Sequence, residues 1–289
     1  MKNTHVKRTG MAVTKIAGLT ALALGTLSSV HAVELEISIT NLTQGNYFTP
    51  RLVVAHTDAA DVFEVGTPAS TALAWLAEAG VIDDAQEPAS AGQNFEAVLG
   101  PADTDNGSNT WHRFGGLVAP ATTLTYTFDT MDKPLLSLAS MLIPTNDAFV
   151  GLDSIEIPTE PGTYSYYLNA YDAGTELNDE LNSTRTDITG VGGTALGGYG
   201  APGVAGAGAP PIAPSMSVGG LGVAVQVGQD ADGNAIGANE VVDGTDGPVH
   251  IHRNTLGDTS ATDGASDLNS TVHRWLNPVA KVTIVVPAA

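Results

Sequence analysis

The sequence predicts an all-β domain in which antiparallel strands form a sandwich, and three observations lead to this class. Eight segments of strand length alternate between apolar and polar residues or run apolar, and turn residues bound nearly all of them. Apolar residues make up 43% of the chain, which is enough for a packed core. The chain has no cysteine, so its stability has to come from that core and not from disulfide bonds.

The first 32 residues have the features of an export signal. Basic residues are spread over positions 2–15, the run 16–30 is apolar, and Val30 and Ala32 supply the small side chains that a signal peptidase accepts. Glycine, threonine and serine interrupt the apolar run, which is also short for a membrane span. We therefore expect cleavage after Ala32, a secreted or periplasmic protein without membrane insertion after cleavage, and one folded domain over residues 33–289.

The predicted strands begin directly after this signal. In the first of them Leu35, Ile37 and Ile39 share one face while Glu34 and Glu36 share the other, so one face is buried and the other meets water. The eight strands are expected at residues 33–42, 49–57, 123–130, 135–144, 149–158, 162–172, 249–253 and 279–287.

One short helix is expected, at residues 68–80. Ser70 or Thr71 can cap its start, apolar residues follow at helical spacing, and Gly80 ends it. We expect this helix to cover an end or an edge of the sandwich, with Trp75 packed there.

A glycine-rich segment interrupts the later part of the domain. Residues 190–220 hold 11 glycines and four prolines and no charged residue. Such a composition cannot build a packed core unaided, so we interpret the segment as a flexible loop insertion. The alternative is a surface that contacts a partner.

The charge balance restricts the possible partners. The formal net charge is −20, and four of the 11 Lys and Arg residues lie within the export signal. A surface this acidic repels nucleic acid and anionic membranes, whereas it attracts divalent cations. We therefore expect an extracellular or envelope ligand, either protein or glycan, and no nucleic acid.

Four separated blocks of the sequence resemble one known family. The stretch "LLSLASMLIPTNDAFVGLDS" (135–154) resembles the core of the spondin N-terminal domain, in which an apolar strand ends in proline and a short acidic turn follows. Residues 47–80, "YDAGTE" (171–176) and the closing strand 277–286 are similar to further blocks of that family, in the same order. The resemblance implies a C2-like antiparallel β-sandwich with a Ca²⁺ ion held by the loops at one end. Animal members are secreted matrix and adhesion proteins, but their cysteines are missing from this sequence.

The direction of the strands leads to the same end of the domain. If residues 135–143 run upward, Asp147 lies in the turn at the top, and the next two strands return the chain to the top at Asp172. Carboxylates gathered there repel one another unless a cation lies between them, and Ca²⁺ accepts about six to eight oxygen ligands. The resemblance places the ligands at Asp147, Asp172 and Glu176, although the family has Asp at the third position. Asp153 is a second candidate, and ordinary solvated turn residues are the alternative.

A second acidic region lies at residues 228–247. It contains Asp230, Asp232 and Asn234 at the spacing that opens an EF-hand loop, but Ala235 stands where the loop needs glycine and Val241 where it needs glutamate. We interpret it as a turn-rich connection between two strands, with a weak second calcium site as the alternative.

The histidines offer a further candidate for metal binding. His250 and His252 alternate on a predicted strand, so both rings point to one face at a spacing that some metal sites use. We interpret them as paired surface histidines, with a transition-metal site as the alternative. His56 is expected to be a hydrogen-bonded structural histidine.

The leading functional hypothesis is an exported calcium-binding β-sandwich that serves as a binding or adhesion module and is not an enzyme. The sequence contains no nucleophile elbow, phosphate-binding loop or zincin helix. Two alternatives stay open. One is a secreted hydrolase that acts on a carbohydrate or an ester, and the other is a self-assembling surface or matrix subunit that uses residues 190–220 for contacts between copies.

Overall fold

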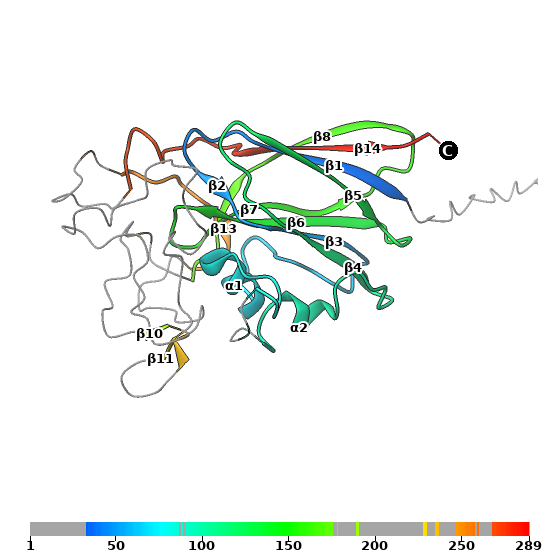
Figure 1. Cartoon of the computed structure of the whole chain (residues 1–289), viewed down its shortest axis with the longest axis horizontal. Helices are drawn as coiled ribbons and strands as arrows, with labels where there is room; N and C mark the ends of the chain where they lie inside the picture. The colour runs from blue at the N-terminus through cyan, green and yellow to red at the C-terminus, as the bar shows by residue number, and fades with distance from the viewer. Residues whose placement is uncertain are drawn as a thin grey trace, which may run out of the picture.

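The computed structural model shows two antiparallel sheets packed face to face, with helices on the outer side of the larger one (Figure 1). It describes residues 33–288 apart from 87, 89–90, 176–177, 179–188, 191–227, 230–234, 237–246, 258 and 260–267. The predicted all-β sandwich is thereby confirmed. Residues 1–32 and nearly all of the segments 190–220 and 228–247 lie outside the described residues, so the predictions for them stay predictions. Among the described helices none is both long and apolar enough to cross a membrane.

The smaller sheet has four strands, and its two central strands alternate strictly between buried and more exposed residues. This pattern arises because one face packs on the core and the other faces water. In spatial order the strands are β5 (Thr123–Asp129), β1 (Glu34–Asn41), β14 (Ala280–Val286) and β8 (Gly162–Leu168).

The larger sheet has seven strands, and its central strands are buried on both faces, so they read as continuous apolar runs. The spatial order is β13 (His250–Ile251), β9 (Ala170–Asp172), β7 (Ala148–Glu156), β6 (Leu135–Ile143), β3 (Arg51–His56) and β4 (Asn109–Phe114), with β2 (Tyr47–Phe48) beside β6. A further small sheet consists of β10 (Thr189–Gly190), β11 (Gly228–Gln229) and β12 (Ala235–Ile236).

Two hydrophobic cores lie on the two faces of the larger sheet, and strand β3 contributes to both. Its Val53 joins the core between the two sheets, where Ile37 and Ile284 of the smaller sheet are fully buried. Its Leu52 joins the core under the helices, together with Leu76. Successive side chains of a strand point to opposite faces, so a strand with helices on one face and a sheet on the other buries every residue.

Helix α1 (Thr71–Ala79) forms where the sequence predicts it. The Ser70 side chain accepts the backbone N–H of Leu73 as N-cap, and Gly80 ends the helix in the left-handed conformation at φ 65°. The predicted position was wrong, because α1 contacts β6 and β7 on the outer face of the larger sheet and not at an end or edge. Trp75 is buried, as predicted.

Several elements were not predicted, among them a second helix and one strand of the larger sheet. Helix α2 (Phe95–Leu99) has only five residues, too few for helical spacing to be recognised. Strand β4 carries mixed polar and aromatic residues, and its pairing with β3 defines it rather than its own pattern.

The segment 162–172, predicted as one strand, forms two strands in different sheets. β8 pairs with β14 in the smaller sheet and β9 pairs with β7 in the larger one, with the break at Asn169. The side chain of Asn277 accepts the N–H of Ala170 at 2.7 Å just after the break. The single strand was therefore wrong, but the predicted up-down-up course is confirmed, because β9 is antiparallel to β7 and β7 to β6, so the chain returns to the end of β6 at Asp172.

Candidate functional site

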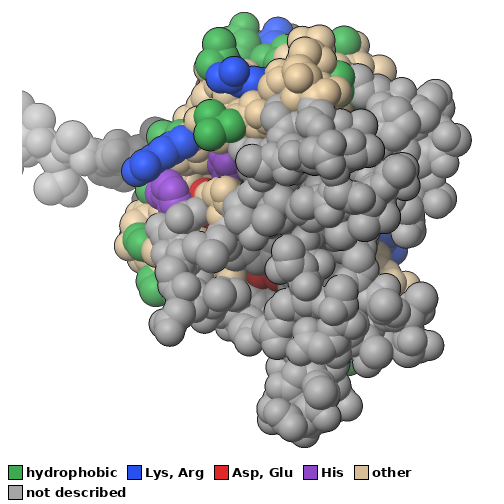
Figure 2. All heavy atoms as spheres, turned by 90° about the vertical axis from the view of Figure 1, so that its left-hand side faces the viewer, with side chains coloured by type: hydrophobic (Ala, Val, Ile, Leu, Met, Phe, Trp, Pro, Cys, Tyr) green, Lys and Arg blue, Asp and Glu red, His purple; other side chains and the backbone are tan. Residues whose placement is uncertain are grey.

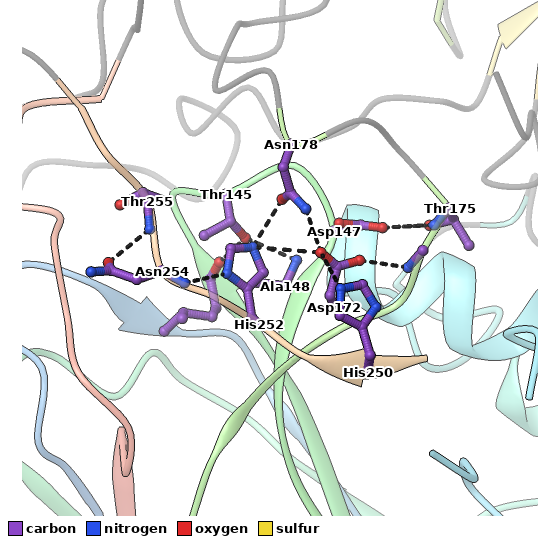
Figure 3. Close-up of polar contacts among 12 residues, drawn as sticks. Thr145, Asp147, Ala148, Asp172, Thr175, Asn178, His250, His252, Asn254 and Thr255 are labelled. Carbon is purple, nitrogen blue, oxygen red and sulfur yellow. Dashed lines mark hydrogen bonds and ion pairs between the residues drawn. The ribbon is translucent and has the colours of Figure 1, made fainter. Parts of the chain in front are cut away.

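The two acidic loops identified in the sequence meet at one end of the larger sheet (Figure 3). Asp147 lies in the turn between β6 and β7, and Asp172 is the last residue of β9. The Cα atoms of Ala148 and Asp172 are partners across β7 and β9, and the N–H of Ala173 donates to the Asp147 carbonyl at 3.3 Å. The strand register thus brings together two aspartates that are 25 positions apart in the sequence.

Asp147 is completely buried, and the second loop holds its carboxylate. Its Oδ2 accepts the backbone N–H of Thr175 at 2.7 Å and lies 3.2 Å from the Thr175 hydroxyl. Thr145 stabilises the turn before it, because its hydroxyl donates to the Leu142 carbonyl and accepts the N–H of Ala148 at 3.1 Å. The carboxylate is therefore positioned by two strand ends at once.

Asp172 is 1% exposed, and neutral groups hold both of its oxygens. Oδ1 accepts the N–H of Gly174 at 2.7 Å, and Oδ2 accepts the side-chain amide of Asn178. Gly174 has φ +72°, and a Cβ at this position would lie 1.8 Å from the Gly247 carbonyl oxygen. Among the described residues, no Lys or Arg contacts this carboxylate.

His250 of β13 and His252, which follows this strand, face the same oxygen of Asp172. The Nε2 atoms of His250 and His252 lie 3.8 Å and 3.9 Å from Asp172 Oδ2. Both rings thus approach one side, as the alternation predicts. The surface interpretation was wrong for His252, which is 3% exposed, whereas the His250 side chain is 30% exposed.

Hydrogen bonds define the tautomers of both rings. His252 Nδ1 accepts the N–H of Asn254 at 3.0 Å, so the ring proton is on Nε2, which donates to Asn178 Oδ1 at 2.9 Å. His250 Nδ1 lies 2.9 Å from the Pro248 carbonyl, which only accepts, so this ring carries its proton on Nδ1. A lone pair therefore stays on Nε2 of His250 in the neutral ring.

Of the two remaining predicted ligands, one lies away from this cluster and the other is not among the described residues. Asp153 is exposed on β7, so the second candidate lies outside the site. Glu176 lies outside the described residues. The described part of the chain contains no group of three or more His, Asp or Glu side chains arranged to hold a metal ion.

Sequence reasoning did not identify several partners of the two aspartates. Thr175, Gly174 and Asn178 follow Asp172 closely, so a loop that folds back over a carboxylate could have suggested them. His250 had no such signal, because only the pairing of β13 with β9 places it opposite Asp172.

Two cavities lie beside the cluster and share Asn254. One, of about 260 Å³, is lined by Asn178 and His252 together with Leu256, among other residues. The other, of about 450 Å³, is lined by Leu42, Gln44, Asn254, Arg274, Trp275 and Leu276, among other residues. Figure 2 shows hydrophobic and basic side chains side by side over the upper part of this end.

A buried serine and histidine elsewhere in the larger sheet hold a β-bulge. His56 donates from Nδ1 to the Thr57 carbonyl at 2.9 Å, so its Nε2 accepts the Ser137 hydroxyl at 2.8 Å. The N–H of Ser154 donates to the same Ser137 oxygen, where the register of β6 and β7 shifts. Since both side chains are at most 1% exposed, this pair supports the sheet, which confirms His56 as a structural histidine.

Comparison with known proteins agrees with this architecture. No match is found among curated proteins. The model of the Spondin_N family matches residues 41–189, which run from the end of β1 past the two aspartates. The matched segment covers more than half of the chain, and this chain therefore belongs to the Spondin_N family.

Proposed function

We propose that this protein is an extracellular binding module whose two aspartate loops hold a Ca²⁺ ion. Membership in the Spondin_N family supports an extracellular role of the binding or adhesion type. The role proposed is binding rather than catalysis, at or outside the cell envelope, with a protein or glycan as ligand.

The observation that carries the calcium proposal is the buried state of Asp172. A carboxylate removed from water is costly unless a positive charge or several hydrogen bonds compensate it. Asp172 is 1% exposed, and its described partners are a backbone N–H, an amide and two imidazole rings. Asp147, completely buried on the neighbouring loop, adds a second negative charge. A divalent cation would offset both.

The chemistry of the loops suits calcium among the hard cations. Ca²⁺ takes about six to eight oxygens in irregular geometry, and carboxylates, amide oxygens, backbone carbonyls and water all serve. Asp147 and Asp172 would be the charged ligands, and backbone carbonyls and water would add neutral oxygens. Glu176, the third ligand that the resemblance implies, would complete the charged set.

Bound calcium would organise the face that meets the ligand. These loops line the smaller cavity, and the larger cavity shares Asn254 with it. The apolar side chains exposed around the two cavities are those of Leu42, Leu256 and Leu276, at 46%, 73% and 84%. Exposed apolar side chains gathered around a hollow are typical of interaction sites. Arg253 and Arg274 lie among them and would favour an acidic ligand.

Thermal unfolding with Ca²⁺ and with chelator tests the proposal. At a free Ca²⁺ concentration of 100 times Kd, the native state should gain about 2.7 kcal/mol, which raises Tm by roughly 5 °C or more. Asp147→Asn and Asp172→Asn should each remove most of that gain. Asp153→Asn is the matched control, because this aspartate is exposed on β7, and it should keep the full gain. Equal melting curves in calcium and chelator, with no calorimetric heat on calcium addition, would disprove the calcium site.

A further inference from the structure

The pair formed by His250 and Asp172 has the features of a site for a different class of metal ion. The Cα atoms of these residues are partners across β13 and β9, so the backbone ladder fixes both side chains on the same face. His250 Nε2 lies 3.8 Å from Asp172 Oδ2. This separation is too long for a side-chain hydrogen bond, because about 3.6 Å already lies beyond the accepted range.

The separation is close to what a shared metal ion requires. Zinc binds histidine nitrogen at ~2.0–2.1 Å and carboxylate oxygen at ~2.0–2.2 Å, so two ligands on one tetrahedral ion lie roughly 3.4 Å apart. A small rotation of the partly exposed His250 ring covers the remaining few tenths of an ångström. The 30% exposure of that ring also gives an ion a path from solvent, whereas Asp172 alone is 1% exposed.

The hydrogen bonds of His250 and Asp172 are of the kind that orients the ligands of a metal ion. A metal-binding histidine donates its other ring N–H to a carbonyl or carboxylate, which orients the ring and keeps the ligand nitrogen unprotonated. His250 does this toward the Pro248 carbonyl at 2.9 Å. Asn178 donates to Asp172 Oδ2 and so fixes the carboxylate, while His252 orients Asn178 through a 2.9 Å hydrogen bond.

His252 itself is not a ligand in this arrangement. Its Nδ1 accepts the N–H of Asn254, so its Nε2 carries a proton and cannot donate a lone pair to a metal. The pair therefore provides one nitrogen and one oxygen, with water to complete the coordination. The described residues contain no group of three such side chains placed to hold a metal ion, so this site would have two protein ligands.

We propose that His250 and Asp172 form a site for a borderline divalent transition metal ion, such as Zn²⁺ or Co²⁺, at the edge of the aspartate loops. Imidazole nitrogen suits these ions, whereas Ca²⁺ prefers oxygen alone. The inference shares Asp172 with the proposed calcium site, and in that respect it rests on the proposed function. A transition metal and calcium would then compete for one carboxylate.

Titration of the whole protein with Zn²⁺ by calorimetry and with Co²⁺ by visible absorption tests this site. His250→Ala should weaken Zn²⁺ binding roughly tenfold or more and reduce the Co²⁺ ligand-field bands. His112→Ala is the matched control, because His112 is also a partly exposed histidine next to an aspartate, Asp103, at 2.6 Å. It should leave both signals unchanged. In nitrogen-detected spectra, Zn²⁺ should shift the His250 ring resonances and not those of His112.

The outcomes separate this inference from the calcium proposal. If His250→Ala leaves Zn²⁺ binding unchanged, or if Zn²⁺ does not bind, the inference is wrong whatever calcium does. If Zn²⁺ binds through His250 but calcium does not raise Tm, the calcium proposal fails and the transition-metal site stands. If both hold, His250→Ala should keep the calcium-dependent rise in Tm, and excess Ca²⁺ should weaken Zn²⁺ binding.

Discussion

The carboxylates at the two ends of strand β6 have different partners. Before β6, Lys133 is 4% exposed and its ammonium contacts Asp105 at 3.0 Å and Asp132 at 2.9 Å. After β6, Asp147 and Asp172 are buried, and the described partners of Asp172 are backbone, amide and imidazole groups. One end carries its own cation, whereas the cation at the other end would be the Ca²⁺ ion that we propose.

At the end before β6, the pKa values of Lys133 and Asp105 are shifted by the pairing of their charges. Burial lowers the pKa of Lys133, but hydrogen bonds to Asp132 and Asp105 outweigh it, so its pKa is raised. The N–H of Gly107 and the Lys133 ammonium lower the pKa of Asp105. Charges that satisfy one another within the chain need no added ion. We therefore expect the stability of the Asp172 end, and not that of the Lys133 end, to respond to metal ions.

The largest difference should appear in acid. His273 is buried next to Thr255, whose hydroxyl donates to the His273 carbonyl at 3.1 Å. Burial lowers the pKa of His273 to about 4 from the ordinary 6.5. Between these pH values the unfolded chain binds the proton and the folded chain does not, so stability falls as pH drops from about 6.5 to about 4. The loss should approach roughly 3 kcal/mol.

Chemical denaturation across pH 4–7 measures this loss. His273→Asn, which can still accept the N–H that Asn269 donates at 2.9 Å, should flatten the curve in this window. His112→Asn, on the surface of β4, should not. If the free energy of unfolding of His273→Asn depends on pH as in the wild type, another group causes the loss of stability in acid.

The next effect concerns the loop that covers Asp172. Gly174→Ala should cost about 2 to 3 kcal/mol, because its φ of +72° is unfavourable for alanine and the new methyl group would meet the Gly247 backbone. Urea denaturation measures this cost. Gly162→Ala at the start of β8 is the control, since the nearest atom to its Cβ is a Tyr164 ring carbon at 3.4 Å. Similar costs for both variants would mean that the loop is not held by this geometry.

A smaller effect is expected at the end of β6 where Lys133 pairs with Asp105 and Asp132. Lys133→Met should cost about 1 to 2 kcal/mol, because Asp105 and Asp132 lose their cation but stay hydrated at 45% and 61% exposure. The same cost should be measured with calcium and with chelator. A calcium-dependent cost would contradict the separation of the two ends.

The smallest effect should distinguish the aspartate end. Without divalent ions, Asp172→Asn should cost less than about 1 kcal/mol, because removing the buried charge offsets most of the loss that arises when the new amide N–H faces the Asn178 amide, which donates to the carboxylate. With calcium, the same variant should be less stable than the wild type. Unfolding in chelator and in calcium gives both values, and a large loss in chelator would show that the carboxylate is satisfied without a metal.

The sequence by itself determined most of the long strands, the caps of helix α1 and the end of the sandwich to which the aspartates belong. These features are local: alternation fixes the faces of β1, and Ser70 and Gly80 mark the ends of α1. The sequence likewise predicted that Asp147 lies in the turn directly after a long apolar strand. The family resemblance rested on the same local blocks, and the family match confirms it.

Only the tertiary structure decided which groups meet at that end. The chain passes from one sheet to the other at Asn169, and β13 pairs with β9 so that His250 lies opposite Asp172. The helix covers a face of the larger sheet, and Asp153 points outward. Alternation tells which face a residue occupies but not which strand lies beside it, because strand pairing is set by packing between segments that are distant in the sequence.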